Sequence, residues 1–270
     1  MERIEKENIN ISNLEVLKER KKKNNVDRGI LVAHDNKRVY KFFDCDSKKY
    51  MGEMQKRIEL LGDENYDRPL LSVFPDEEIF DGDKFVGYTQ EYIPDAVSLN
   101  DVVMFDDKDL YDFVRLSSKA SEILDYIHGD FRGIVLCDMN FTNIIISKKD
   151  KYKIPYFIDF DDCAIGGRVG PTAISVNLNA FLKDKGLPRV VSQETDKISM
   201  AISFFNIIFG TNNFAISLYD FDMMCEKYPF LEDMRDLFKS LKSERCLYGI
   251  DYLHDVIDPD KLGEGKKLIK

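Results

Sequence analysis

The sequence predicts an α+β protein whose β-rich first third is followed by a largely helical remainder. Short β-rich runs separated by turn residues fill the first third, and from about residue 109 the apolar residues recur at helical spacing. A chain of 270 residues with 44% hydrophobic content can build one large domain or two lobes that share a cleft. We therefore expect two segregated lobes, formed by residues 1–93 and 94–270.

The first elements are expected to be a helix and a hairpin. The charged run at residues 18–25 is typical of a solvated helix end that leads into a loop, which predicts a helical extension at the N-terminus. Residues 29–34 and 37–44 are β-rich and are separated by Asp35-Asn36, a turn signal that predicts a hairpin. A helix should follow over residues 47–61, where apolar residues fall on one face and Ser47 can cap the N-terminus.

The later elements follow from the same patterns. Strands are expected at residues 70–80 and 85–93, with the turn Asp81-Gly82-Asp83 between them and Pro94 after the second. Residues 109–128 have helical periodicity, and Gly129 stands where helices often end. Three short apolar runs come next, at residues 133–136, 143–147 and 156–158, and helices are expected from about residue 195.

Composition excludes several classes of function. The formal net charge is -10, with 49 acidic and 39 basic residues, which argues against broad binding to nucleic acid or anionic membranes. The five cysteines are scattered and include no C-x-x-C pair, so neither a zinc ribbon nor a disulfide framework is indicated. There is no apolar leader and no run of 18 apolar residues, and we expect a soluble cytoplasmic protein.

The stretch from residue 134 to 162 carries the candidate chemistry. Asp138 and Asn143 stand in D-x-x-x-x-N spacing within a polar loop, and Asp159 follows a later apolar run. Strands on either side should deliver all three side chains to one rim. Asp and Asn also cap loops and turns in every protein, which is the plain structural alternative.

These motifs resemble the catalytic-loop and metal-binding motifs of the protein kinase superfamily. The resemblance implies a bilobal fold with a β-rich, nucleotide-binding N-lobe and a helical C-lobe. By the same resemblance Asp138 orients the acceptor hydroxyl and accepts its proton, while Asn143 and Asp159 bind the Mg²⁺ ions of ATP.

Further resemblance lies in the N-terminal third. Val39-Tyr40-Lys41-Phe42 is similar to the strand that carries the family's phosphate-binding lysine, which assigns that role to Lys41. The helix after it should supply a glutamate partner, for which Glu53 is the choice and Glu59 the alternative. Either glutamate could instead be a solvated helix residue.

The lobe junction and the loop support are assigned in the same way. Residues 90–94 look like the hinge, so that the backbone of Glu91 and Ile93 would meet adenine and Gln90 would take the gatekeeper position. Asp196, at the start of an apolar helix, resembles the aspartate that braces the catalytic loop.

The departures from the family leave the acceptor open. Leu136 and Cys137 replace the His and Arg before the catalytic aspartate, Asn140 replaces a lysine, and Asp161 replaces the glycine after Asp-Phe. No Gly-rich loop and no A-P-E segment are found. We therefore expect a Mg²⁺- and ATP-dependent phosphotransferase acting on a hydroxyl of a protein or small molecule. A pseudokinase that binds nucleotide or acts as a scaffold is the alternative, and nucleotidyl transfer is a weaker one.

Overall fold

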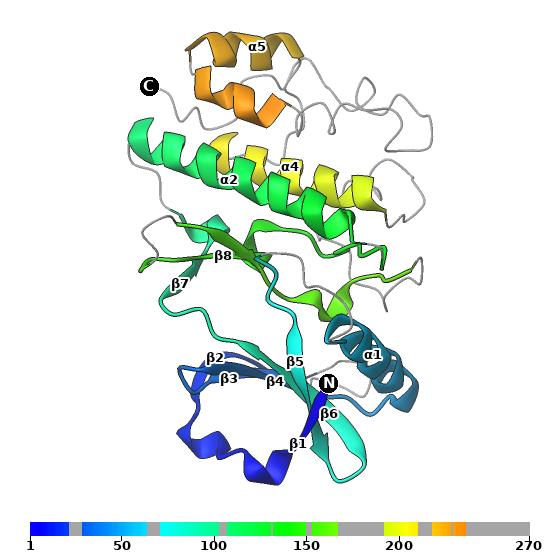
Figure 1. The fold of residues 1–270 in the computed structure, drawn as a ribbon. Coiled ribbons are helices and arrows are strands. Elements are labelled where there is room, and N and C mark those ends of the chain that lie inside the picture. Colours follow the sequence, from blue (N-terminus) through cyan, green and yellow to red (C-terminus); the bar gives the residue numbers. More distant parts are fainter. Residues whose placement is uncertain are drawn as a thin grey trace.

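The protein is α+β, as predicted, with a six-stranded sheet, a three-stranded sheet and a small number of helices (Figure 1). The computed structural model describes residues 1–21, 29–63, 71–102, 107–130, 132–149, 153–166, 192–209, 218–227 and 229–235. The strands are β1 (Glu2–Glu5), β2 (Glu15–Arg20), β3 (Gly29–His34), β4 (Arg38–Asp44), β5 (Pro75–Asp81), β6 (Lys84–Glu91), β7 (Ala96–Ser98), β8 (Ile144–Ser147) and β9 (Pro155–Phe157). The helices are α1 (Lys48–Leu61), α2 (Asp107–His128), α4 (Gln193–Phe209) and α5 (Leu218–Lys227).

The large sheet has the order β1-β5-β6-β4-β3-β2, and all of its neighbours are antiparallel except the β1 and β5 pair. The predicted hairpin is confirmed as β3 and β4, with Asn36 in the left-handed region at φ 66°. The two strands around the Asp81-Gly82-Asp83 turn are confirmed as β5 and β6, with boundaries a few residues away from those predicted.

The central strand β4 is covered on both faces, so that residues 39–43 are all buried, Lys41 included. One face packs against α1 through a cluster that includes Phe43, Met54 and Tyr88. The other face, with Tyr40 and Phe42, is covered by partly buried side chains of the N-terminal segment, namely Ile9, Ile11 and Leu14. In Figure 1 this segment passes below the sheet, on the side away from α1.

The predicted N-terminal helical extension is wrong. The described residues before β3 form two short strands and two single 3-10 turns, Lys6–Asn8 and Ile11–Asn13. The charged sequence of β2 is compatible with a strand because β2 lies at the sheet edge, where pairing with β3 uses backbone groups and its side chains remain exposed.

The predicted helix at residues 47–61 is confirmed as α1. The Ser47 hydroxyl accepts a hydrogen bond from the Tyr50 backbone N–H at 3.3 Å, which is the predicted cap. The buried face of α1 carries Met51, Met54, Ile58 and Leu61, and this face packs on β5 and β6.

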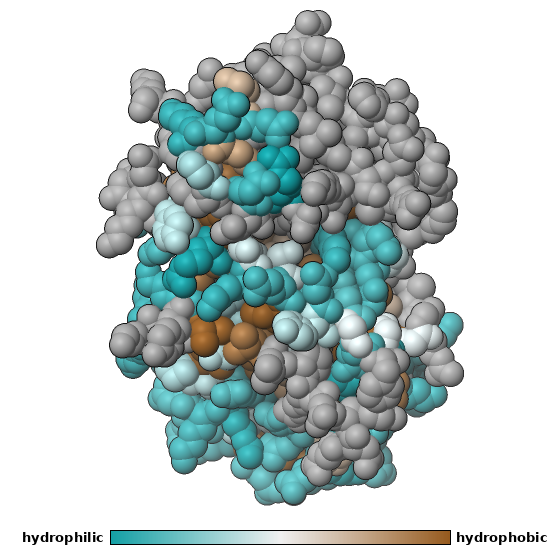
Figure 2. Space-filling view, turned by 45° about the horizontal axis from the view of Figure 1, so that its top comes forward, coloured by the Kyte–Doolittle hydropathy of each residue, from teal (hydrophilic) through white to brown (hydrophobic). Residues whose placement is uncertain are grey.

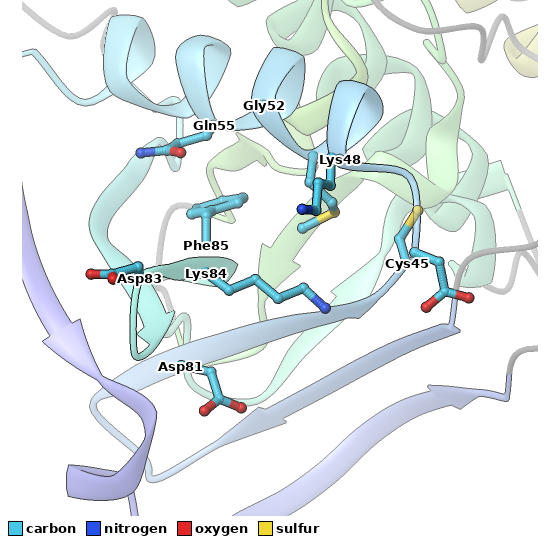
Figure 3. Close-up of a pocket in the computed structure, with 10 residues that line it drawn as sticks. Cys45, Lys48, Gly52, Gln55, Asp81, Asp83, Lys84 and Phe85 are labelled. Atoms are coloured by element: carbon cyan, nitrogen blue, oxygen red, sulfur yellow. The ribbon is translucent and has the colours of Figure 1, made fainter.

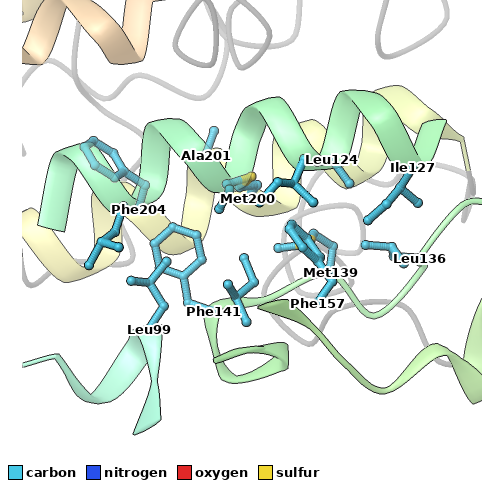
Figure 4. Packing of buried hydrophobic residues seen from close by; sticks show 14 of the residues in the cluster. Leu99, Leu124, Ile127, Leu136, Met139, Phe141, Phe157, Met200, Ala201 and Phe204 are labelled. Atoms are coloured by element: carbon cyan, nitrogen blue, oxygen red, sulfur yellow. The ribbon is translucent and has the colours of Figure 1, made fainter. Parts of the chain in front are cut away.

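The second core lies between α2, α4 and the antiparallel sheet β7-β8-β9 (Figure 4). The rings of Phe113 and Phe204 stack with their centroids 5.7 Å apart, and Phe141 meets Phe113 at 5.9 Å. Phe141 comes from the loop that also carries Asp138, so the core anchors that loop directly.

The surface in Figure 2 is hydrophilic over most of its described area, with an apolar patch near the middle of the view. Among the described helices, none has both the length and the apolar character that a membrane crossing requires.

Candidate functional site

Asp196 fixes the loop that carries Asp138. Its carboxylate accepts hydrogen bonds from the backbone N–H of Leu136 at 2.6 Å and of Cys137 at 3.0 Å. The ring nitrogen Nε2 of His128, the last residue of α2, lies 3.0 Å from the same carboxylate. Burial raises the pKa of Asp196, while these hydrogen bonds oppose the shift. The bracing contact expected of Asp196 is therefore present.

The loop backbone takes an unusual conformation at Cys137, whose φ is 62°. An isolated bridge between Val135 and Ala164 holds the loop just before this residue. Cys137 is buried, and burial together with the Asp196 carboxylate raises the pKa of its thiol to about 12. A thiol in that state is a poor nucleophile, which argues against Cys137 as a reactive group.

Asp138 is half-buried and is tied to two asparagines. Asn143 donates from Nδ2 to the Asp138 carbonyl at 2.9 Å, and Asn140 donates to the same carbonyl at 3.0 Å and to the carboxylate at 3.3 Å. Burial raises the pKa of Asp138, and the nearby carboxylates of Asp162 and Asp161 raise it further.

Asn143 also joins this loop to the segment that carries Asp159. The backbone N–H of Ile158 donates to the Asn143 carbonyl at 3.0 Å, and Asp159 follows in the left-handed region at φ 69°. Because the Asn143 amide nitrogen is engaged by Asp138, its amide oxygen is the atom that can serve as a ligand. Asn143 thus connects Asp138 to the segment that carries Asp159.

Lys41 reaches the same place from β4. Its ammonium donates to the Asp159 carboxylate and, at 2.6 Å, to the Asp161 carboxylate. Burial would lower the pKa of Lys41, but the two carboxylates hold it well above the usual value. Burial raises the pKa of Asp159 to about 7 even though the Lys41 ammonium opposes this shift.

Close strand packing positions Lys41. A Cβ atom at Gly87 in β6 would stand 2.1 Å from the Lys41 carbonyl oxygen, so only glycine fits there. The Tyr88 hydroxyl lies 3.4 Å from the Asp161 carboxylate that Lys41 contacts.

Glu53 is not placed beside Lys41, which corrects that prediction. Its side chain is 52% exposed and lies 4.0 Å from Lys49 on the solvent side of α1. Glu59 is also exposed and accepts a hydrogen bond from Gln55. The residue that α1 directs inward is Arg57, whose guanidinium donates to the Asp161 carbonyl.

Arg57 was not predicted from the sequence, and Asp161 was predicted only as a replacement for glycine. Arg57 falls on the apolar stripe of α1 beside Met54, Ile58 and Leu61, and a charge in such a stripe was the available signal. Asp161 is 1% exposed, and its burial could not be seen from the sequence because Asp-Phe-Asp-Asp reads as a polar turn.

The predicted hinge residues link the two sheets. Gln90 is buried in β6, Glu91 is exposed at the end of that strand, and Ile93 is buried just before β7. Tyr92 anchors the connection, since its ring stacks on His34 with the centroids 4.2 Å apart and its N–H donates to the Lys37 carbonyl at 3.2 Å.

A cavity of about 580 Å³ opens between α1 and the β5-β6 hairpin (Figure 3). Phe85 points toward α1 from β6, while Lys48 and Lys84 extend from opposite sides. None of the residues predicted to act in chemistry lines this cavity.

The arrangement offers oxygen ligands of the kind that a hard cation prefers. Within the described residues, no group of three or more His, Cys, Asp or Glu side chains is placed to hold a metal ion by itself. Mg²⁺ is commonly held by one or two carboxylates completed by substrate phosphates and water, and the Asp159 carboxylate with the Asn143 amide oxygen fits that pattern. No protein-family model matches this chain, and no curated protein matches it.

Proposed function

We propose that this chain is a Mg²⁺- and ATP-dependent phosphotransferase with a bilobal, protein-kinase-like fold. Residues 1–93 form the nucleotide-binding lobe, and residues 94–270 carry the catalytic loop and the helical core. The enzyme moves the γ-phosphoryl group of ATP to a hydroxyl of a protein or a small molecule.

One observation carries the proposal. Lys41 in β4 meets Asp159 across 118 residues of sequence, and Asn143 ties the Asp159 segment to Asp138. Lys41 therefore reaches the Asp159 segment from a separate element, and Asn143 links that segment to Asp138. Turn capping alone requires only local partners, so it does not account for this connection.

The proposed roles follow from what each group can do. Asp159 and the Asn143 amide oxygen would hold Mg²⁺, which supplies charge neutralisation and orientation of the phosphates. Asp138 orients the acceptor hydroxyl and accepts its proton, and its raised pKa suits a group that must bind a proton during the reaction.

Lys41 contacts the phosphates while Asp161 keeps its ammonium in place. Asp161 is fully buried and stays in contact with Lys41. The Asp159 side chain is 34% exposed and faces the site. Asp161 thus acts as the carboxylate partner of Lys41, the role that the resemblance assigned to Glu53. The backbone of Glu91 and Ile93 meets adenine, with Gln90 behind it.

A nucleotide-binding module without transfer activity is the second candidate. Its support is the engagement of Lys41 by two carboxylates, together with the outward position of Glu53. In such a protein the cluster would serve binding or scaffolding alone.

The test follows label from ATP. Pure protein with Mg²⁺ is incubated with γ-labelled or α-labelled ATP and candidate acceptors, beside the Asp138→Asn variant. Transfer of γ label by the parent alone is the expected result. Transfer of α label would indicate nucleotidyl transfer, and ATP binding without transfer to any acceptor would favour the binding module.

A further inference from the structure

Lys18 lies on the same face of the large sheet as Lys41. The register pairs Lys18 in β2 with Val32 in β3, Val32 with Lys41 in β4, and Lys41 with Tyr88 in β6. Residues directly opposite one another in antiparallel strands share a face, so these four side chains form one row. Val32 and Tyr88 both belong to the cluster under α1, which confirms the face.

A bulge in β2 sets this orientation. The register shifts between Val16 and Lys18, so that Leu17 is the extra residue and Lys18 takes the place opposite Val32. The next residue on that face is Arg20, opposite Ile30, while Glu19 points to the other side. The edge strand therefore adds cationic side chains to the face that carries Lys41.

Lys18 also acts electrostatically on Asp138, in the loop after α2. Burial, Asp162 and Asp161 raise the pKa of the Asp138 carboxyl, and the Lys18 ammonium counteracts part of this shift. The two charges are therefore near enough to interact, although one belongs to β2 and the other to the loop after α2. The Lys18 side chain is exposed and can meet a ligand.

The site needs a further cation if it is to hold a triphosphate. Asp162 and Asp161 act electrostatically on Asp138, and Asp161 also acts on Asp159. The charge that Lys41 brings is already shared by Asp159 and Asp161. Residues 21–28, between β2 and β3, contain no glycine, so a Gly-rich loop whose backbone amides cradle phosphates is not encoded there.

We propose that Lys18 binds the phosphate groups of the nucleotide from the sheet face that carries Lys41, in the role that a Gly-rich loop fills elsewhere. This inference rests on the proposed function and adds a residue to its site. The ligand chemistry is a polyphosphate chain, which either a nucleoside triphosphate or an inorganic polyphosphate would supply. A lysine on an edge strand can also serve only to prevent pairing with other chains, and the experiment separates these roles.

The experiment measures the Kd of the full chain for three ligands: ATP with Mg²⁺, adenosine and inorganic tripolyphosphate. The parent is compared with Lys18→Gln, Lys18→Arg and Lys49→Gln. Lys49→Gln is the matched control, since it removes the same charge from the solvent side of α1. We expect Lys18→Gln to weaken ATP binding about tenfold or more, because a charge-assisted contact is lost. Adenosine binding should change less than about twofold, Lys18→Arg should stay near the parent, and added salt should shrink the difference.

The outcomes distinguish this inference from the proposed function. If the parent binds ATP and Lys18→Gln binds it equally well, the role of Lys18 is overturned and the proposed function stands. Equal weakening of ATP and adenosine, or a lower melting temperature of the ligand-free variant, would mean that Lys18 acts on the fold, which also overturns it. Binding of tripolyphosphate but not ATP by the parent would identify a polyphosphate site without adenine recognition, and binding of neither would overturn both proposals.

Discussion

The loop that carries Asp138 is fixed by backbone hydrogen bonds, whereas the cluster around Lys41 is fixed by charges. In the loop, Asp196 holds two consecutive N–H groups and Phe141 is packed in the core. Around Lys41, the ammonium is shared between Asp159 and Asp161, and Arg57 contacts the same segment from α1.

The loop of Asp138 is therefore preorganised, whereas the contacts around Lys41 can rearrange. Backbone contacts to a buried carboxylate do not depend on a ligand, so we expect Asp138 to keep its place when a ligand binds. An ion pair can exchange partners when a phosphate or a cation arrives, because the new charges compete directly for the old ones. Four substitutions test the two kinds of support.

The largest effect is expected for Asp196→Ala. The substitution leaves the N–H groups of Leu136 and Cys137 and the His128 ring without their buried acceptor. Breaking a buried charged network of this kind costs about 3–5 kcal/mol in the free energy of unfolding. Urea denaturation of both proteins measures it, with Asp83→Ala in the exposed β5-β6 turn as control. A loss below about 1 kcal/mol would contradict the bracing role.

Asp138→Asn should leave the fold and the ATP affinity intact while lowering turnover by about 10²-fold or more. An amide keeps the shape of the carboxylate and its contact with Asn140, but it cannot accept the proton of the acceptor. Steady-state turnover and ATP titration on the two proteins test this. Unchanged turnover would remove Asp138 from the chemical step.

Local patterns predicted most of the fold because they reflect contacts close in sequence. The Asp35-Asn36 turn, the Ser47 cap and the periodicity of α2 each depend on a few neighbouring residues. β2 was not predicted because it pairs with the next strand through backbone contacts, and its charged side chains show no strand pattern. An edge strand of this kind is recognisable only once its partner is known.

The positions of the candidate residues were predictable where spacing reflects a fixed loop and unpredictable where a helix face had to be chosen. Asp138, Asn143 and Asp159 belong to one strand-loop-strand unit, so their order along the chain sets their convergence. Glu53 and Arg57 are both on α1, but only the packing of α1 on the sheet decides that Arg57 faces inward. The sequence offers three or more charged candidates for one inward position.

Asp159→Ala should remove most of the Mg²⁺-dependent stabilisation by ATP. For the parent, ligand at about 100 times its Kd stabilises by about 2.7 kcal/mol, and the variant should retain little of the part that requires Mg²⁺. The measurement is the melting temperature with ATP, with and without Mg²⁺, and Asp83→Ala is again the control. If the variant and the parent respond equally to Mg²⁺, Asp159 is not a ligand.

The smallest effect is expected for Arg57→Gln, which compares the two candidate partners on α1. Arg57 is buried and donates to the Asp161 carbonyl, so its loss should cost about 1.5 kcal/mol in the free energy of unfolding, the scale of a hydrogen bond from a charged group. It should also raise the KM for ATP, because Asp161 would hold Lys41 less firmly.

Glu53→Gln is the matched comparison on α1. It changes an exposed pair that is worth well under 1 kcal/mol, and it should alter neither the free energy of unfolding nor the KM for ATP. Denaturation and steady-state kinetics on both variants give the answer. If Glu53→Gln impaired ATP use while Arg57→Gln did not, Glu53 would be the residue of α1 that supports Lys41, and the role proposed for Asp161 would be overturned.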